Sequence, residues 1–134
     1  SEGNPQTVAI PLADERDKEC LPMNLQLLFL LYRPTLAAMV VSSWVRNIGY
    51  KDPMLETTVQ MCRQFGIRND PLKTEAVMVY VGDGGRSEIW VAPISRHQDK
   101  PPSLSQWEEI KGGSGRFSSM LQDAFDSMKE AGKA

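Results

Sequence analysis

The single histidine, His97, is the first residue to examine for catalysis, because acid–base chemistry near neutral pH most often uses an imidazole. It lies in a polar stretch, with Ser95 two positions before it. Nucleophilic chemistry would need Ser95 or Cys62 to lie beside this imidazole. Cys62 is expected to face inward on a helix, and neighbours in sequence do not by themselves define a geometry. We therefore expect a solvated histidine, no catalytic residue and no enzymatic function.

The sequence also lacks the spacing of ligand residues that a metal site needs. Cys20 and Cys62 lie far apart and form no Cys-x-x-Cys pair, which is the usual sign of a zinc site. The acids Asp123, Asp126 and Glu130 fall on the expected solvent side of a helix, and they do not follow the spacing of a calcium loop. We expect no metal and no cofactor. The two cysteines are expected to be independent thiols, with a disulfide as the alternative.

Two glycine-rich stretches could bind an anion through backbone amides. Residues 82–85 connect two expected strands, and no helix follows them. Residues 112–115 precede an expected helix, but a helix stands where the preceding strand of a phosphate loop should be, and no Gly-Lys-Ser/Thr follows. We interpret 112–115 as a linker. If an anion binds anywhere, the amides of residues 114–117 are the best candidates.

Basic residues in the middle of the chain offer a second type of function. Residues 21–73 carry six bases and three acids, although the formal net charge of the whole chain is −2. Basic side chains interleaved with aromatic rings can neutralise phosphates and stack on bases. The candidate nucleic-acid contacts are Arg46, Lys51, Arg63, Arg68 and Lys73. Surface charges scattered around core aromatic residues are the simpler interpretation, because Trp44 also fits an apolar helix face.

The elements that would position these residues form one domain with tails. With 134 residues, of which 41% are hydrophobic and 24% charged, the chain has ordinary globular composition. We expect a polar, acidic arm over 1–19, a helical core plus a β-hairpin over 20–98, and a C-terminal helical segment with a Gly-rich linker over 99–134. The arm is too polar to order itself alone.

Two consecutive helices, or one helix kinked at Pro34, are expected near the start of the core. Apolar residues occupy every side of the segment from Leu25 to Tyr32, which predicts a helix buried all round. Residues 35–47 place Leu36, Met39 and Trp44 among apolar positions at helical spacing, which predicts a second helix. Arg33 and Pro34 divide the apolar run into pieces shorter than the ~20 residues of a bilayer span, so no transmembrane span is expected.

Capping signals indicate three further helices. Asp52 can cap a helix that begins at Pro53 and ends at Gly66. Ser105 and Glu108 have capping-box spacing, which predicts a short helix that carries Trp107 inward. The last helix follows Ser119, and it shows one narrow apolar stripe. The stripe consists of Met120, Leu121, Ala124, Phe125 and Met128.

One β-hairpin is expected over residues 73–94, where two alternating apolar runs flank Asp83-Gly84-Gly85. A three-residue loop would pair Val79 with Ile89, and Val77 with Val91. Met78 would then lie opposite Trp90 on the second face of the hairpin, together with Tyr80 and Ile94. A two-stranded hairpin is marginal alone in water, so each face needs a cover.

These expectations define an α+β fold with N-terminal helices, one antiparallel β-hairpin and C-terminal helices. The function that they favour is a non-enzymatic protein–protein interaction or assembly module, which self-associates as a homo-oligomer or docks into a larger complex. Its expected partner-binding residues are Met78, Tyr80, Trp90, Ile94, Phe125 and Met128. The alternative is a nucleic-acid-binding or packaging protein that uses the basic 46–73 segment. The sequence leaves the compartment open.

Overall fold

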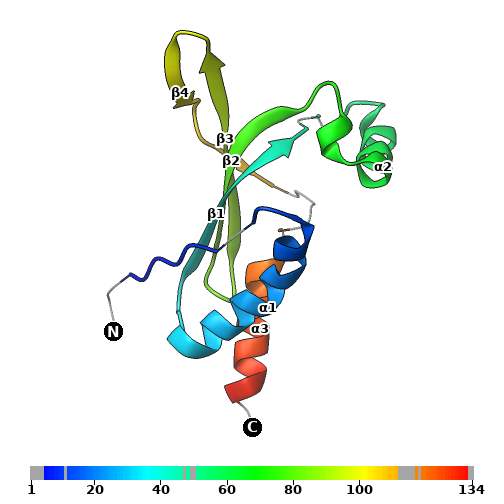
Figure 1. Ribbon diagram of the computed structural model, residues 1–134. Coiled ribbons are helices and arrows are strands. Elements are labelled where there is room, and N and C mark those ends of the chain that lie inside the picture. The colour runs from blue at the N-terminus through cyan, green and yellow to red at the C-terminus, as the bar shows by residue number, and fades with distance from the viewer. Residues whose placement is uncertain are drawn as a thin grey trace.

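An antiparallel sheet of five strands carries helices α1 and α3 on one of its faces in the computed structural model (Figure 1). The structure describes residues 5–10, 12–46, 48, 51–111, 117 and 119–132. Its helices are α1 (Glu15–Tyr32), α2 (Leu55–Phe65), the 3₁₀ turn η1 (Ile67–Asn69) and α3 (Met120–Gly132). Its strands are β1 (Ala37–Val45), β2 (Thr74–Gly82), β3 (Ser87–His97), β4 (Lys100–Leu104) and β5 (Glu108–Ile110). The mixed α+β class is confirmed, but the expected arrangement of helices around a single hairpin is not.

Residues 37–45 form strand β1, so the prediction of a helix over 35–47 was wrong. β1 pairs antiparallel with β2 along its whole length, from Ala37 opposite Gly82 to Val45 opposite Thr74. Burial alternates along the strand, with Met39 and Val41 buried and Val40 exposed between them. The segment is rich in β-branched residues, and a two-residue period fits a sheet buried on one face. Pairing with β2 therefore outweighs the helical spacing.

Helix α1 begins inside the segment that was expected to be a disordered arm. Asp14 caps it, because its carboxylate accepts the amide of Asp17 at 2.9 Å, while the Asp17 carboxylate accepts the amide of Ala13 at 2.9 Å. The helix ends at Arg33, which adopts the left-handed conformation (φ 49°) directly before Pro34. The cap thus makes residues 15–19 of the acidic arm the first turn of a core helix.

The hydrophobic core lies between helices α1 and α3 and the sheet face that they cover. Phe29 of α1 meets Phe125 of α3 edge to face, with ring centroids 4.7 Å apart. Around this pair pack residues from both helices and from two strands. They are Leu21, Leu25, Met39, Val41, Met78, Met120, Leu121 and Ala124. The predicted apolar stripe of the last helix is therefore confirmed, and it closes the core.

The β2–β3 hairpin has a register one residue away from the expected one. Val79 lies opposite Trp90, and Met78 lies opposite Val91. Asp83 explains the shift, since its amide donates to the Arg86 carbonyl (3.1 Å) and its carboxylate accepts the Gly85 amide (2.8 Å). The turn is therefore centred on the two glycines. A shift of one residue in register moves the side chains of one strand to the other face of the sheet relative to its partner strand. Met78 and Trp90 therefore lie on opposite sides of the sheet.

The turn of this hairpin is attached to the last helix. Gly84 has φ +91°, and a Cβ there would lie 3.4 Å from the Phe125 ring. The Gly84 carbonyl accepts hydrogen bonds from Gln122 (3.0 Å) and Lys129 (3.3 Å). Glycine is required here both by the backbone conformation and by the close approach of α3.

Residues 100–110 form two short strands, so the prediction of a helix at Ser105 was wrong. β4 and β5 follow one another along the outer side of β3, joined through a hydrogen bond from the Ser105 amide to the Pro93 carbonyl (2.8 Å). Trp107, which was expected to point inward, is exposed. Strand pairing with β3 satisfies more of this backbone than one isolated helical turn could.

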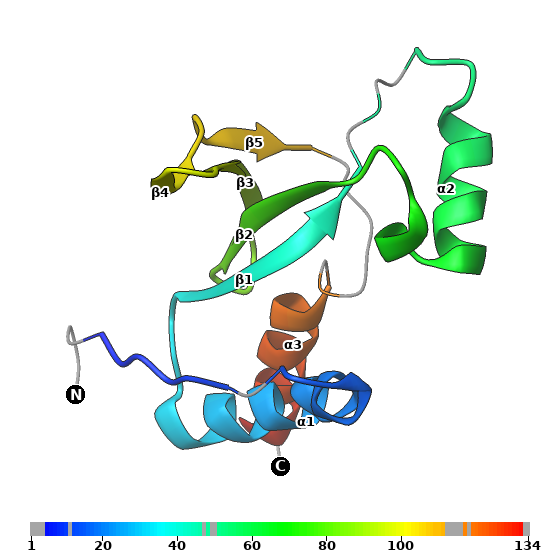
Figure 2. The ribbon, with the colours of Figure 1, turned by 45° about the horizontal axis from the view of Figure 1, so that its top comes forward.

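Helix α2 lies apart from α1 and α3, near the ends of β1 and β2 (Figure 2). The helix begins at Leu55, not at Pro53 as predicted, and its N-cap residue is Met54, which makes no side-chain cap hydrogen bond. The Asp52 carboxylate accepts the Met54 amide at 2.8 Å in the turn before the helix. None of its residues is buried, although Leu55, Val59 and Cys62 are half-buried. Among the residues that the structure describes, no helix is both long and apolar enough to cross a membrane.

We predict that Phe125→Ala lowers the free energy of unfolding by about 3–5 kcal/mol, because it removes a ring that is 2% exposed and packs on Phe29. The matched control is Phe65→Ala on α2, a ring that is 56% exposed. That change should alter stability by no more than about 0.5 kcal/mol. Urea unfolding measures both values, and equal losses would contradict this description of the core.

Candidate interaction surface

The candidate catalytic residues each have other contacts or lie in solvent. His97 is exposed at the end of β3, where it pairs with Lys100 across the β3–β4 hairpin. The hydroxyl of Ser95 lies 3.2 Å from that of Ser105. The Cys62 thiol donates to Asp70 at 3.7 Å. In the described ranges, no three acidic, histidine or cysteine side chains form a group that could hold a metal.

The candidate nucleic-acid residues are divided by their contacts. Arg46 donates to both oxygens of Asp70, at 2.7 and 2.8 Å, which fastens the end of β1 to the turn after η1. Lys73 donates to the Arg68 carbonyl at 2.7 Å and lies 5.1 Å from the Trp44 ring centroid. Lys51, Arg63 and Arg68 have exposed side chains. Arg46 and Lys73 therefore have structural roles, and the role of this set in nucleic-acid binding stays a prediction.

The surroundings of the Arg46–Asp70 pair change the pKa of Asp70 and that of Cys62. The pKa of Asp70 is lowered, first by the hydrogen bond from the Leu72 amide and then by Arg46, although desolvation opposes these effects. The pKa of Cys62 is raised, mainly by burial and next by the charge of Asp70. A raised pKa disfavours the thiolate, which is the nucleophilic form of cysteine. Cys20 and Cys62 are both free thiols.

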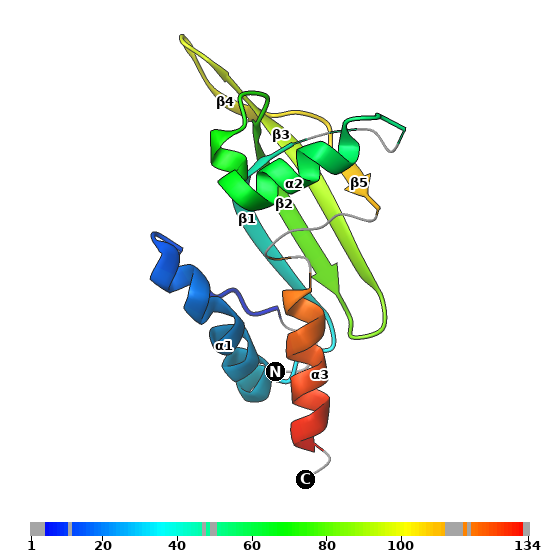
Figure 3. The ribbon, with the colours of Figure 1, turned by 90° about the vertical axis from the view of Figure 1, so that its right-hand side faces the viewer.

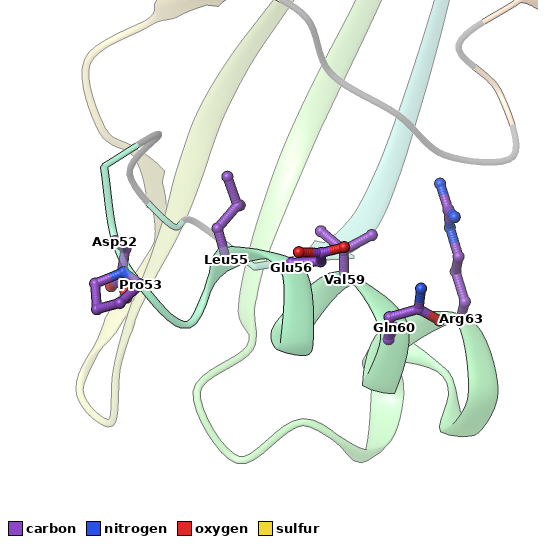
Figure 4. A pocket seen from close by; sticks show the side chains of 7 residues that line it. All are labelled: Asp52, Pro53, Leu55, Glu56, Val59, Gln60 and Arg63. Carbon is purple, nitrogen blue, oxygen red and sulfur yellow. The ribbon is translucent and has the colours of Figure 1, made fainter.

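A hollow of about 490 Å³ lies along α2 (Figure 4). All of its described lining residues come from one stretch of sequence, so no second element of the described structure forms an opposite wall. They are Asp52, Pro53, Leu55, Glu56, Val59, Gln60 and Arg63. Binding sites for small molecules enclose most of the ligand surface. A hollow with a single wall does not provide that enclosure.

The six expected partner-binding residues do not form one surface. Met78 and Phe125 are buried in the core, and Tyr80 and Met128 are half-buried against it. Tyr80 lies edge to face with Phe117, at 6.3 Å between centroids, and burial raises its pKa. Trp90 and Ile94 lie on the opposite face of the sheet, because the register places Trp90 beside Val79. The Met78/Trp90 face that the sequence suggested therefore does not exist.

The structure places an apolar surface on α1 instead. Leu21, Leu25 and Phe29 face the core, while the opposite side of the helix exposes four large apolar side chains. These are Met23 (66% exposed), Leu27 (58%), Leu30 (40%) and Leu31 (71%), which we call the α1 stripe. Their spacing of three and four residues places them on one side of a helix. The sequence signal was present, since both sides of this segment are apolar, but it was interpreted as complete burial.

A second exposed apolar area lies on the sheet face opposite to α1 and α3. Val40 is 64% exposed and Trp44 is 43% exposed on this side of β1. Val79 and Trp90 continue the same side across β2 and β3, where they are half-buried. Figure 3 shows α1 and α3 together on the other side. We call this area the outer sheet face.

The predicted anion site cannot be compared with the structure, because residues 112–116 lie outside the described residues. Comparisons with known proteins add no assignment: no family model, no curated protein and no solved structure matches the chain. The surface and the contacts described above are therefore the basis for any functional argument.

We predict that Asp70→Asn destabilises the protein at pH 7 and that this effect shrinks in acid. The folded protein lowers the pKa of Asp70 below its unfolded value of about 3.9. The stabilisation is therefore present above the unfolded pKa, and it is lost as the pH falls through the folded pKa. The difference in Tm between wild type and variant should narrow below about pH 4.

Asp99→Asn, at an exposed position in the β3–β4 turn, is the control for this experiment. Its Tm should follow that of the wild type throughout. A Tm difference for Asp70→Asn that stays constant from pH 7 to pH 2.5 would show that the carboxylate charge does not contribute.

Proposed function

We propose that this chain is a non-enzymatic assembly module, which self-associates or docks into a larger protein complex through apolar surface that its own fold leaves uncovered. The observation that carries the proposal is the α1 stripe, in which four large apolar side chains lie on the side of the helix that faces away from the core. Contiguous exposed apolar surface of this kind marks interaction sites in folded proteins.

Burial energetics support the same proposal. A leucine or methionine side chain gains about 1.5–3 kcal/mol when it moves from water into an apolar environment. Leu27 and Leu31 are each more than half exposed, so α1 retains much of this free energy for a partner. A soluble helix needs only one apolar side to hold it on its domain. The second apolar side of α1 is thus not needed to hold the helix on its domain, and it fits a contact with another protein.

We predict that Leu27→Gln/Leu31→Gln weakens association by at least about tenfold, since it places polar groups in the apolar contact. Glutamine is a good helix former and leaves the net charge at −2, so neither helix loss nor a Coulombic effect should complicate the result. Sedimentation velocity over a concentration series measures self-association. For a partner complex, co-purification with wild type and variant in parallel gives the comparison.

The control variant is Met61→Gln/Phe65→Gln on α2. It changes two apolar residues with the same four-residue spacing and comparable exposure (54% and 56%), but in a different part of the surface. It should associate as the wild type does. If wild type and both variants are monomeric and co-purify with the same proteins, the α1 stripe is not an interface and the proposal is wrong.

A further inference from the structure

Strand β1 has one row of backbone groups that faces away from the sheet, and the pairing pattern identifies them. In an antiparallel pair of strands, every second residue exchanges backbone hydrogen bonds with its partner strand. The Asp83 amide donates to the Arg86 carbonyl, so every second residue of β2 counted back from Asp83 bonds to β3. These residues are Val81, Val79 and Val77. The remaining residues of β2 bond to β1. Their partners are Ala37, Met39, Val41, Ser43 and Val45. The amides and carbonyls of Ala38, Val40, Ser42 and Trp44 therefore point outward.

These outward groups have no backbone partner among the described residues. β1 is the end strand of the described sheet, and among the described residues its backbone bonds to no other backbone than that of β2. The Trp44 carbonyl also accepts the neighbouring Ser43 hydroxyl at 3.2 Å. Residues 5–9, which pass this side of the sheet in Figure 1, are exposed and donate no backbone hydrogen bond to it. An unpaired edge of this kind is a template for another strand.

The two edges of the sheet differ in the features that normally prevent such pairing. The β4–β5 edge contains Pro101 and Pro102, carries charges at Lys100, Glu108 and Glu109, and has shifts in register. The β1 edge spans nine residues without charge, proline or shift in register. Natural proteins protect exposed edges with charges, prolines and irregularities. Of the two edges of the described sheet, the β1 edge is the one that lacks charges, prolines and irregularities.

We propose that β1 pairs antiparallel with β1 of a second copy of this chain, about a twofold axis at Val41. This inference rests on the proposed function and names the partner. In that register Val40 lies opposite Ser42 of the copy, and Ala38 lies opposite Trp44. All four outward residues then find partners, because each bonded pair joins two residues whose backbone groups point outward.

Charge and side-chain size favour a second copy as the occupant. The strand has no charged residue, so placing it beside itself creates no like-charge contact. Each of the two kinds of bonded pair joins a larger side chain to a smaller one: Trp44 to Ala38, and Val40 to Ser42. The exposed side chains of Val40 and Trp44 would extend the outer sheet face into that of the copy. Figure 3 shows α1 on the same side of the molecule as this edge.

The test compares Val40→Pro with Val40→Thr in the full chain. Proline removes an outward amide that β2 does not use, so strand β1 should stay in the sheet. Threonine keeps the amide and the β-branched shape. We expect wild type and Val40→Thr to form dimers in sedimentation equilibrium. Val40→Pro should raise the dissociation constant roughly tenfold or more.

Residue-resolved hydrogen exchange of the wild type gives a second measurement that needs no variant. The amides of Ala38, Val40, Ser42 and Trp44 should gain protection as the protein concentration rises. Those of Met39, Val41 and Ser43 should be protected at every concentration, since they bond to β2. On dilution, the amides of alternate residues of one strand would thus differ in how much protection they lose. A change in the overall stability of the protein would not produce this alternation.

Three outcomes separate this inference from the proposed function. A dimer that dissociates in Val40→Pro but not in Val40→Thr supports the pairing. A dimer that survives Val40→Pro but dissociates in Leu27→Gln/Leu31→Gln overturns the β1 pairing and leaves the assembly function intact. A wild-type monomer with unprotected outward amides at high concentration overturns the pairing, and the α1 co-purification experiment then decides the function.

Discussion

The contact between Phe29 and Phe125 is the interaction on which the rest of this structure depends. It joins a helix near the start of the described chain to the helix near its end, and both then lie on one face of the sheet. The same ring of Phe125 meets Gly84, which fixes the β2–β3 turn against α3. The position of the hairpin, the burial of Met78 and the choice of which side of α1 faces water all follow from this packing.

The sequence was informative where the pattern is local. The capping residues and apolar periodicity of α2 and α3 predicted those helices, and the alternating runs predicted the β2–β3 hairpin. β1 was missed because its apolar residues fit a helical and an extended period at once, and only β2, some thirty residues later, decides between them. The hairpin register was missed because Asp83 acts through its side chain, bonding to the Gly85 and Arg86 amides to select a tighter turn.

The candidate surface was harder to predict for a related reason. Sequence shows that Leu27 and Leu31 are apolar, but burial depends on whether other elements are available to cover them. Once residues 37–45 join the sheet, they no longer form a second helix beside α1, and one side of α1 keeps its solvent exposure. The expected Met78/Trp90 surface failed by the same logic, since a single step in register transferred Trp90 to the other side. Exposure is thus a property of the assembled fold, and local pattern alone does not determine it.

The difference between the two edges of the sheet limits the size of any assembly built by strand addition. A sheet that can accept strands at both ends grows without limit, as fibrils do, since each new subunit presents another open end. Here the prolines and charges of β4 and β5 block one end and leave the other bare. The proposed β1 pairing would therefore stop after a single step, and it would give a closed dimer in place of a growing fibril.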